Sequence, residues 1–269
     1  QSTTHSIKQY KNDRDPNEPI FQFKKGALVH FAVDTDLAFM ATRLSGRKTF
    51  FLPFNLGYND GAGNPPAQEE HYRTGYLWEH VLQRDSLLDI FARFMHLQKE
   101  EKKILKDGAI KKISKETMIF PRYHQLDSVR KMISHSKEHG AGRNYLVEHS
   151  AGSGKSNSIA WLAHRLSSLH DADDKKIFDT VVVITDRRVL DKQLQDTIYQ
   201  FEHKQGVVQK IDEDTRQLVT ALQTGTPIII STIQKFPFVT ETIDKINKEL
   251  GEGSAALSTK GKRFAVIVD

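Results

Sequence analysis

A glycine-rich run in the second half of the chain has the residue types that bind phosphate. Residues 149–156 read His-Ser-Ala-Gly-Ser-Gly-Lys-Ser. Glycines let the backbone turn tightly and point its N–H groups inward, and a helix that follows adds a favourable field for an anion. Lys155 can reach the β- and γ-phosphates of a nucleotide, and the Ser156 hydroxyl can ligate magnesium. The run predicts an ATP and Mg²⁺ site made by Ala151, Gly152, Ser153, Gly154, Lys155 and Ser156.

The surroundings of this phosphate loop (residues 149–156) fit the motif, with one departure. A strand is predicted over 144–148 and an apolar helix over 155–170, which is the context that the motif requires. The strict pattern has a glycine where this chain has His149. The motor helicases of superfamily 2 relax that position and keep G-x-G-K-[ST], as found here. A chance glycine-rich turn would lack this register of strand, lysine, hydroxyl and helix.

The last residue, Asp269, follows an apolar run at 264–268. Ligands of parallel α/β sheets bind at the carboxyl ends of the strands, so this aspartate is predicted to hold magnesium through water. Taken alone, it is equally an ordinary strand-end carboxylate. Its spacing from the phosphate loop favours the nucleotide interpretation, with Lys155 and Asp269 as catalytic residues. A glutamate follows the aspartate in this motif, so the sequence is expected to stop within it.

The elements that position these residues alternate between helices and apolar strands. Helices are predicted over 121–139, 155–170, 188–201 and 214–222, and strands over 144–148, 180–184, 227–230 and 264–268. Strands that are apolar throughout and separated by helices indicate a parallel sheet covered on both faces. The second half is therefore predicted to be an α/β domain.

The first half has a different pattern. Strands are predicted over 27–33, 37–43 and 49–52, and their short separators imply antiparallel hairpins. A long loop over 57–75, helical spacing over 77–97 with a break at 85–86, and a lysine- and glutamate-rich connector over 98–115 follow. The connector is expected to hold a short strand or hairpin near 107–108.

Composition sets wide limits on function. The 269 residues are enough for roughly two domains. Cysteine is absent, which excludes disulfides and thiolate metal sites and favours a cytoplasmic location. No apolar run reaches the roughly 18 residues that span a bilayer, so no membrane is expected as a partner. The net charge of +5 suits a polyanionic partner, although a solvated surface with extra lysines gives the same balance.

Three stretches resemble motifs of superfamily 2 motors. Residues 120–125 (Phe-Pro-Arg-Tyr-His-Gln) resemble the adenine-reading segment, which implies that Arg122 and Gln125 bind ATP. Residues 182–194 resemble motif Ia, and residues 230–236 resemble the next strand-edge motif. Polar groups at such places contact the DNA backbone without reading sequence, or are ordinary solvated loop residues. The predicted DNA contacts are Arg187, Arg188, Gln193, Thr232, Gln234 and Lys235.

With residues 14–16, 74–78 and 83–88, these stretches resemble the restriction (motor) subunit of type I restriction–modification enzymes. The resemblance implies ATP-driven translocation along double-stranded DNA, cleavage far from the recognition site, and the methyltransferase and DNA-specificity subunits as partners. It implies three regions: the tail of an α/β, PD-(D/E)xK-type nuclease domain over 1–56, a loop, helical connector and linker over 57–116, and a first RecA-like P-loop ATPase domain over 117–269, truncated at motif II.

The nuclease part departs from the family pattern. Gln9 matches the glutamine of a Q-x-x-x-Y element, but Asp13 occupies the tyrosine position. The nuclease catalytic residues are therefore expected upstream, and Gln9 is otherwise an exposed polar helix residue. Two alternatives remain: another superfamily 2 helicase or remodeller, or an ATP-switched docking module.

Overall fold

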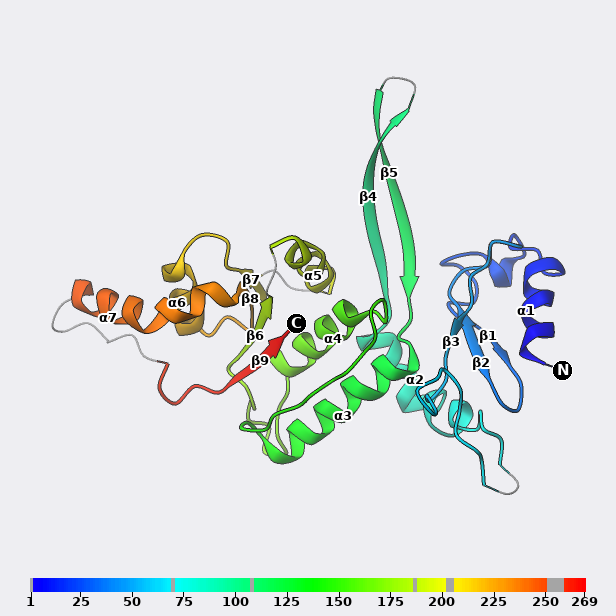
Figure 1. Cartoon of the computed structure of the whole chain (residues 1–269), viewed down its shortest axis with the longest axis horizontal. Coiled ribbons are helices and arrows are strands. Elements are labelled where there is room, and N and C mark those ends of the chain that lie inside the picture. The colour runs from blue at the N-terminus through cyan, green and yellow to red at the C-terminus, as the bar shows by residue number, and fades with distance from the viewer. Residues whose placement is uncertain (1, 69–70, 107–108, 186–187, 202–205, 251–258) are drawn as a thin grey trace. The chain divides into compact units, whose positions relative to one another are not determined.

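The computed structural model describes the chain except residues 1, 69–70, 107–108, 186–187, 202–205 and 251–258. Side chains at 101–106, 109–113, 188–193 and 250 are not described either. The chain forms two compact units, residues 1–127 and 128–269 (Figure 1). None of the described helices is long and apolar enough to cross a bilayer.

A small antiparallel sheet organises the N-terminal unit. It has the order β1-β2-β3, formed by β1 (His30–Val33), β2 (Ala38–Ala41) and β3 (Leu52–Pro53). This confirms the predicted antiparallel pairing, although each strand is shorter than predicted. The helix α1 (Thr3–Asn12) is tied to the sheet because the Thr3 backbone N–H donates to Asp34 Oδ2 at 2.7 Å. The short 3-10 helix η1 (Pro19–Phe21) lies between α1 and β1 in the chain.

Aromatic rings fill the core of this unit. Phe54 is fully buried, and its ring lies 5.4 Å from Phe31, 6.0 Å from Phe120 and 5.9 Å from Tyr123, measured between centroids. Burial of such large apolar side chains is the main driving force for folding. The predicted loop over 57–75 is confirmed for its described residues, which form no helix or named strand.

The predicted helical region is broken into two pieces. A π-helical turn, η2 (Leu77–Val81), precedes α2 (Arg84–Arg93), so the break falls at 82–83 and not at 85–86. The prediction also extended the helix too far, because β4 (His96–Lys106) begins at His96.

The connector is a long β-hairpin. β4 pairs antiparallel with β5 (Ala109–Ile119), each strand having 11 residues. The sequence analysis predicted only a short strand or hairpin near 107–108 in this connector, so it underestimated the length of the hairpin. Opposite charges that meet across the two strands stabilise the pairing. Lys99 Nζ lies 3.8 Å from Glu116 Oε1, and the other Glu116 oxygen accepts from Lys24.

The C-terminal unit is built on a four-stranded sheet with the order β7-β8-β6-β9. All three strand pairs are parallel, which confirms the predicted α/β architecture. The strands are β6 (Thr180–Thr185), β7 (Val208–Lys210), β8 (Ile228–Thr232) and β9 (Phe264–Val268). Its helices are α4 (Lys155–Ser167), α5 (Arg188–Gln200), α6 (Thr215–Thr224), η3 (Ile233–Phe238) and α7 (Val239–Leu250). The helix α3 (Tyr123–His139) runs across the boundary of the two units.

Both faces of the central strands are covered. Val182 and Ile229 pack with Leu218 and Leu222 of α6. The neighbouring residues Val181 and Ile228, which face the other way, are 0% exposed. This two-sided burial explains why the strands are apolar throughout.

One predicted strand does not form. Residues 144–148 have strand-like composition, but they make no ladder and are exposed, with Leu146 93% exposed. A strand needs a neighbour for its backbone groups, and the described residues place none beside this segment. The sequence prediction also missed β7, η3 and α7.

Candidate functional site

The phosphate loop leads into α4 through left-handed backbone. Gly154 is the N-cap of α4 with φ 89° and ψ 34°, and Gly152 has φ 75°. Such φ values favour glycine, because a Cβ atom would clash with the backbone. No side chain caps the helix at Gly154. The local backbone thus has the form of an anion-binding turn at a helix N-terminus.

The carboxyl edge of the sheet brings three polar residues into line. Thr185 of β6 pairs in register with Thr232 of β8. The Asp269 N–H donates to Ile184 O at 3.0 Å, so Asp269 continues the β6–β9 ladder to the same edge. Thr185 is 2% exposed, and its Oγ1 has no hydrogen-bond partner among the described residues. Sequence reasoning did not single out Thr185 as a site residue, although its position at the end of an apolar strand was visible.

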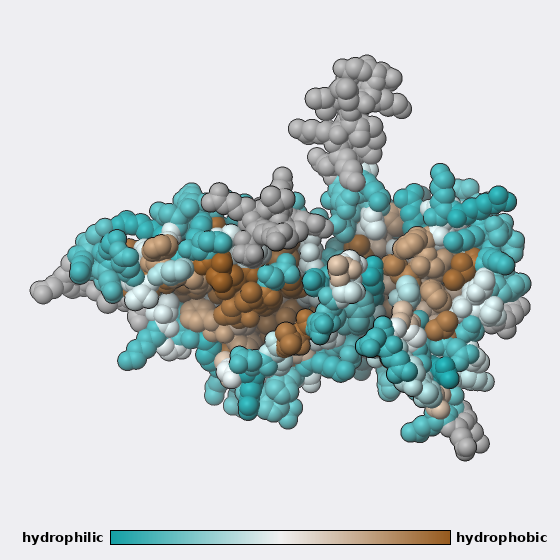
Figure 2. All heavy atoms as spheres, in the orientation of Figure 1, coloured by the Kyte–Doolittle hydropathy of each residue, from teal (hydrophilic) through white to brown (hydrophobic). Residues whose placement is uncertain are grey.

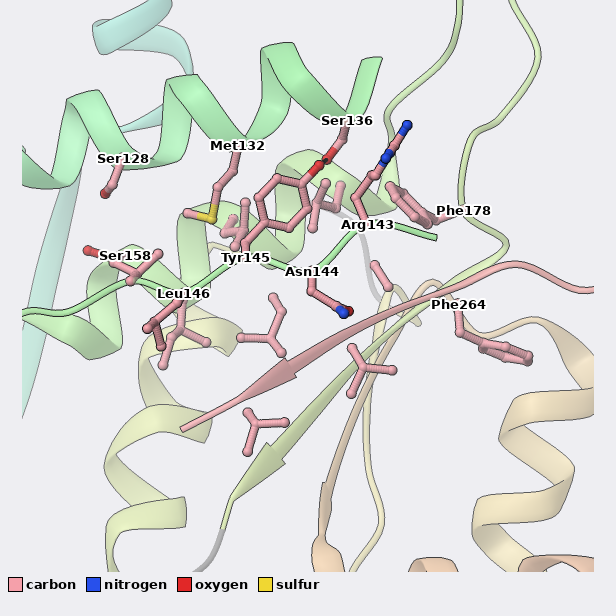
Figure 3. Close-up of a pocket in the computed structure, with 18 of the residues that line it drawn as sticks. Ser128, Met132, Ser136, Arg143, Asn144, Tyr145, Leu146, Ser158, Phe178 and Phe264 are labelled. Atoms are coloured by element: carbon pink, nitrogen blue, oxygen red, sulfur yellow. Dashed lines mark hydrogen bonds between the residues drawn. The ribbon is translucent and has the colours of Figure 1, made fainter. Parts of the chain in front are cut away.

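Lys155 and Asp269 line one cavity of about 360 Å³ in the C-terminal unit. Its walls come from α3, from the segment before the phosphate loop, and from β9 (Figure 3). Both residues thus line the same cavity, and their joint action on a nucleotide stays a prediction. Arg143 and Tyr145 also line the cavity, and sequence reasoning had assigned them no role.

The charge at this cavity is set by few groups. Burial, followed by the positive charge of Lys155, lowers the pKa of His149 below its usual value of 6.5. The imidazole is therefore neutral at neutral pH, and it places no second positive charge beside the lysine.

Oxygen donors that suit magnesium are present at the loop and at the strand end. Ser156 is half-buried in the first turn of α4, and Asp269 is exposed at the end of β9. Hard oxygen ligands are those that Mg²⁺ prefers, and the ion usually keeps several waters and substrate phosphates. No group of three or more His, Asp or Glu among the described residues could hold a metal. Asp269 lines the cavity and Ser156 is not among its lining residues, so a magnesium ion held by both stays a prediction.

Arg122 and Gln125 lie in the N-terminal unit at the start of α3. Gln125 is 3% exposed, and its Oε1 accepts from the Arg122 backbone N–H at 2.8 Å. This is the arrangement in which a glutamine at the third helical position caps its own helix. The structure thus gives Gln125 a local capping role, and its contact with adenine stays a prediction.

The predicted DNA contacts fall into three groups. Arg187 lies outside the described residues, and Arg188 and Gln193 belong to α5 but their side chains are not described. Thr232 ends β8, and Gln234 is exposed in η3. These DNA contacts stay predictions.

Lys235 is held by the protein itself. Its Nζ donates to Ile211 O at 2.8 Å and to Glu213 O at 3.2 Å. The side chain therefore fixes the loop between β7 and α6, and DNA binding by this lysine also stays a prediction.

Gln9 lies on α1, away from any acidic cluster among the described residues. Its Nε2 is 3.3 Å from His5 Nε2 on the exposed side of the helix. Asp13 follows as the C-cap of α1. The structure thus gives Gln9 a partner within its own helix, and its nuclease association stays a prediction.

A parallel sheet with an acidic residue at its carboxyl edge, together with a phosphate loop that opens a helix, is typical of a P-loop nucleotide-binding α/β domain. The family model of SWI2/SNF2 ATPases matches residues 124–269. The chain belongs to the SWI2/SNF2 ATPase family, which confirms the predicted ATP-using, superfamily 2 helicase-like domain. No curated protein and no solved structure matches the chain.

Proposed function

We propose that this chain is part of the motor and endonuclease subunit of a type I restriction enzyme. In this function, ATP hydrolysis drives translocation along double-stranded DNA, and cleavage occurs away from the recognition site. The observation that carries the motor part is that Lys155 and Asp269 line one cavity in a SWI2/SNF2 ATPase domain. The restriction part is supported by the sequence resemblance, which continues through the N-terminal unit.

The residues of the site have separate proposed roles. The backbone around Gly152 and Gly154 and the Lys155 ammonium bind the phosphates. Ser156 and Asp269 hold magnesium, which supplies Lewis-acid stabilisation of the phosphoryl group when it is bound. The strand-edge residues Thr232 and Gln234 contact the DNA backbone.

The proposed domain arrangement keeps the three regions of the resemblance. Residues 1–56 are the tail of the nuclease domain, 57–116 are the connector, and 117–269 belong to the first RecA-like ATPase domain. The proposed partners are double-stranded DNA and the methyltransferase and DNA-specificity subunits, in the cytoplasm.

Replacing the phosphate-loop lysine tests the motor part. Lys155→Ala in the assembled enzyme should lower ATP hydrolysis by about 100-fold or more, because a preorganised charge on the transferring phosphoryl group is lost. Lys175→Ala is the matched control, since Lys175 is a surface lysine of the same unit with a 74% exposed side chain, 3.6 Å from Asp173. An unchanged hydrolysis rate in Lys155→Ala would end the proposal.

The family membership itself supports a second candidate, a remodeller or helicase of superfamily 2. Stimulation of ATP hydrolysis by duplex DNA, single strands and RNA should separate the candidates. The restriction function requires stimulation by duplex DNA that carries the recognition site, together with cleavage in the presence of the partner subunits. Slow hydrolysis that no nucleic acid accelerates would assign an ATP-switched docking module instead.

A further inference from the structure

The C-terminal end of α3 carries two stacked histidines. His135 and His139 are four residues apart, and their rings stack with centroids 4.0 Å apart and planes 13° from parallel. Both residues are exposed, at a hydrophilic part of the surface of the C-terminal unit (Figure 2). Side chains four residues apart on a helix are neighbours, with Cβ atoms about 5–6 Å apart. Small rotations of these exposed side chains can therefore bring both imidazoles to one ligand.

A hydrogen bond holds the ring of His139 in a form that can bind a metal. Its Nδ1 lies 3.1 Å from the backbone oxygen of His135. A carbonyl oxygen can only accept, so Nδ1 carries the proton and Nε2 keeps its lone pair in the neutral ring. Within the part of the chain that the structure describes, this Nε2 has no hydrogen-bond or ion-pair partner. A histidine that donates its Nδ1–H to a backbone carbonyl is a common form of metal ligand.

Tyr145 can orient the ring of His135 in the same way. The His135 Nδ1 lies 2.9 Å from the Tyr145 hydroxyl oxygen, and the two rings meet edge-on at 5.5 Å. Ser136 Oγ lies 3.3 Å from the same hydroxyl and can accept its proton, which leaves the phenol oxygen to accept the His135 Nδ1–H. Figure 3 shows Tyr145 directed at Ser136 of α3. In this arrangement both histidines present Nε2 as the nitrogen with the lone pair.

We propose that His135 and His139 form a two-histidine site for a divalent transition-metal ion of the class of Zn²⁺, Cu²⁺ and Ni²⁺. Neutral imidazole nitrogen suits these ions, whereas Mg²⁺ prefers oxygen ligands. Two histidines four residues apart on one helix face are also the paired ligands of helical zinc motifs. Water completes the coordination, because no group of three or more His, Asp or Glu among the described residues could hold a metal.

The site binds a metal without hydrolysing peptides. Residues 135–139 read His-Ser-Lys-Glu-His, which is the H-x-x-E-H spacing that some zinc peptidases use. Catalytic zinc sites have three protein ligands, and the described residues supply no third one here. The recorded contact of the Glu138 carboxylate is with His139 Nδ1, at 3.9 Å, which is the protonated nitrogen and not the one that binds the ion.

A bound ion would act on the segment that enters the phosphate loop. A cation at Nε2 of His135 draws charge from the ring and makes the Nδ1–H a stronger donor to the Tyr145 hydroxyl. Tyr145 lies four residues before His149, the first residue of the phosphate loop. The ion would thus hold this segment more firmly against α3, with Tyr145 as a positioning residue of the metal site. The inference stands whether or not the protein acts in restriction.

Zinc titration tests the site in purified protein without a histidine tag, because the chain has no cysteine to compete for the ion. His135→Ala and His139→Ala should each weaken the tightest Zn²⁺ binding at least tenfold, since a single histidine cannot chelate. The double variant should bind no more weakly than either single variant, and excess Mg²⁺ should not displace the Zn²⁺. Alanine is the better helix former, so α3 is kept in these variants.

His170→Ala is the matched control and should leave the affinity unchanged. His170 is an exposed histidine of the same unit, and its Nδ1 likewise lies 3.0 Å from a backbone oxygen, that of Ser168. Nitrogen NMR of the imidazoles gives an independent measurement. Zn²⁺ should shift the Nε2 signals of His135 and His139 together, at a concentration at least tenfold below that which shifts His170.

Two results would overturn the proposal. One is a Zn²⁺ affinity in either single variant as high as that of His170→Ala. The other is a Zn²⁺-induced shift at Nδ1 of His135 or His139 in place of Nε2. Tyr145→Phe keeps both ligands and removes only the hydroxyl, so it should weaken Zn²⁺ binding by about tenfold, as loss of a ligand's hydrogen-bond partner usually does. An unchanged affinity in this variant would contradict the positioning role of Tyr145.

Discussion

At the residue scale, His149 and Lys155 are coupled through charge. Burial and Lys155 both disfavour the protonated imidazole, so the folded protein binds this proton more weakly than the unfolded chain does. Because the pKa of His149 is lowered in the folded state, its contribution to stability is present above pH 6.5 and is lost as the pH falls below that value. The phosphate loop is therefore expected to be most stable at neutral and alkaline pH.

We predict that Lys155→Met raises the pKa of His149 toward its usual value, because one of the two causes of the lowering is removed. Burial remains, so the pKa should still lie below 6.5. NMR titration of the imidazole measures the shift, with Lys175→Met as the control for a lysine of the same unit that contributes nothing to it. If the two variants give the same His149 pKa, charge coupling between the loop residues is absent.

Residue types alone predicted the phosphate loop and Asp269, because glycine, lysine, hydroxyl and carboxylate at that spacing have few other uses together. They did not predict that Gln125 caps α3 or that Lys235 holds carbonyl groups of a loop. A glutamine or lysine beside a strand or helix end can form hydrogen bonds equally well with the protein's own backbone or with a ligand. Only tertiary contacts separate the two uses.

At the element scale, two glycines with similar backbone conformations have different tasks. Gly154 begins α4 with φ 89°, and Gly225 ends α6 with φ 70°. We predict that alanine at either position lowers the free energy of unfolding by about 1–2 kcal/mol, because the left-handed region is strained for residues with a Cβ. A Cβ at Gly225 would meet no atom within 4 Å, so its cost is conformational only.

The two variants should differ in nucleotide binding. Gly154→Ala should weaken binding of ATP analogues at least tenfold, since it changes the turn that presents the loop to phosphate, whereas Gly225→Ala should leave binding unchanged. Denaturant unfolding and calorimetric titration of the complete protein measure the two effects. Equal affinities for the two variants would show that the turn at Gly154 has no role in binding.

Elements with a strong sequence period were predicted well, and those that depend on a neighbour were not. The strand β6 has β-branched residues on both faces, so the sequence alone identifies it as a strand before its neighbouring strands are known. Residues 144–148 have an apolar centre of Tyr145, Leu146 and Val147 but no adjacent strand among the described residues, so this short apolar run was insufficient to predict a strand. For the hairpin of β4 and β5 the error was the opposite one, because too little strand was predicted. The many charged residues of this segment hide the regular pairing of its two strands.

At the scale of the whole molecule, α3 links the two units through different residues of one helix. Tyr123 belongs to the aromatic core of the N-terminal unit, and Met132 lines the cavity of the C-terminal unit. The chain has two tryptophans, Trp78 and Trp161, one in each unit. Single-tryptophan variants, with the other changed to phenylalanine, can therefore report the unfolding of each unit separately.

We predict that Phe120→Ala destabilises the unit of Trp78 by about 3–5 kcal/mol, the usual cost of removing a buried phenylalanine. Phe120 is 4% exposed, and its ring lies 6.0 Å from Phe31 and 6.0 Å from Phe54, so the lost contacts belong to that unit. Leu194→Ala, at a position 1% exposed in the other unit, should lower the Trp161 transition by about 2–5 kcal/mol. In fluorescence-detected urea unfolding of the two single-tryptophan backgrounds, Phe120→Ala should therefore shift the Trp78 transition more than the Trp161 transition. Leu194→Ala should do the reverse. If each substitution instead shifts both transitions equally, the units unfold as one cooperative body, and α3 transmits stability between them.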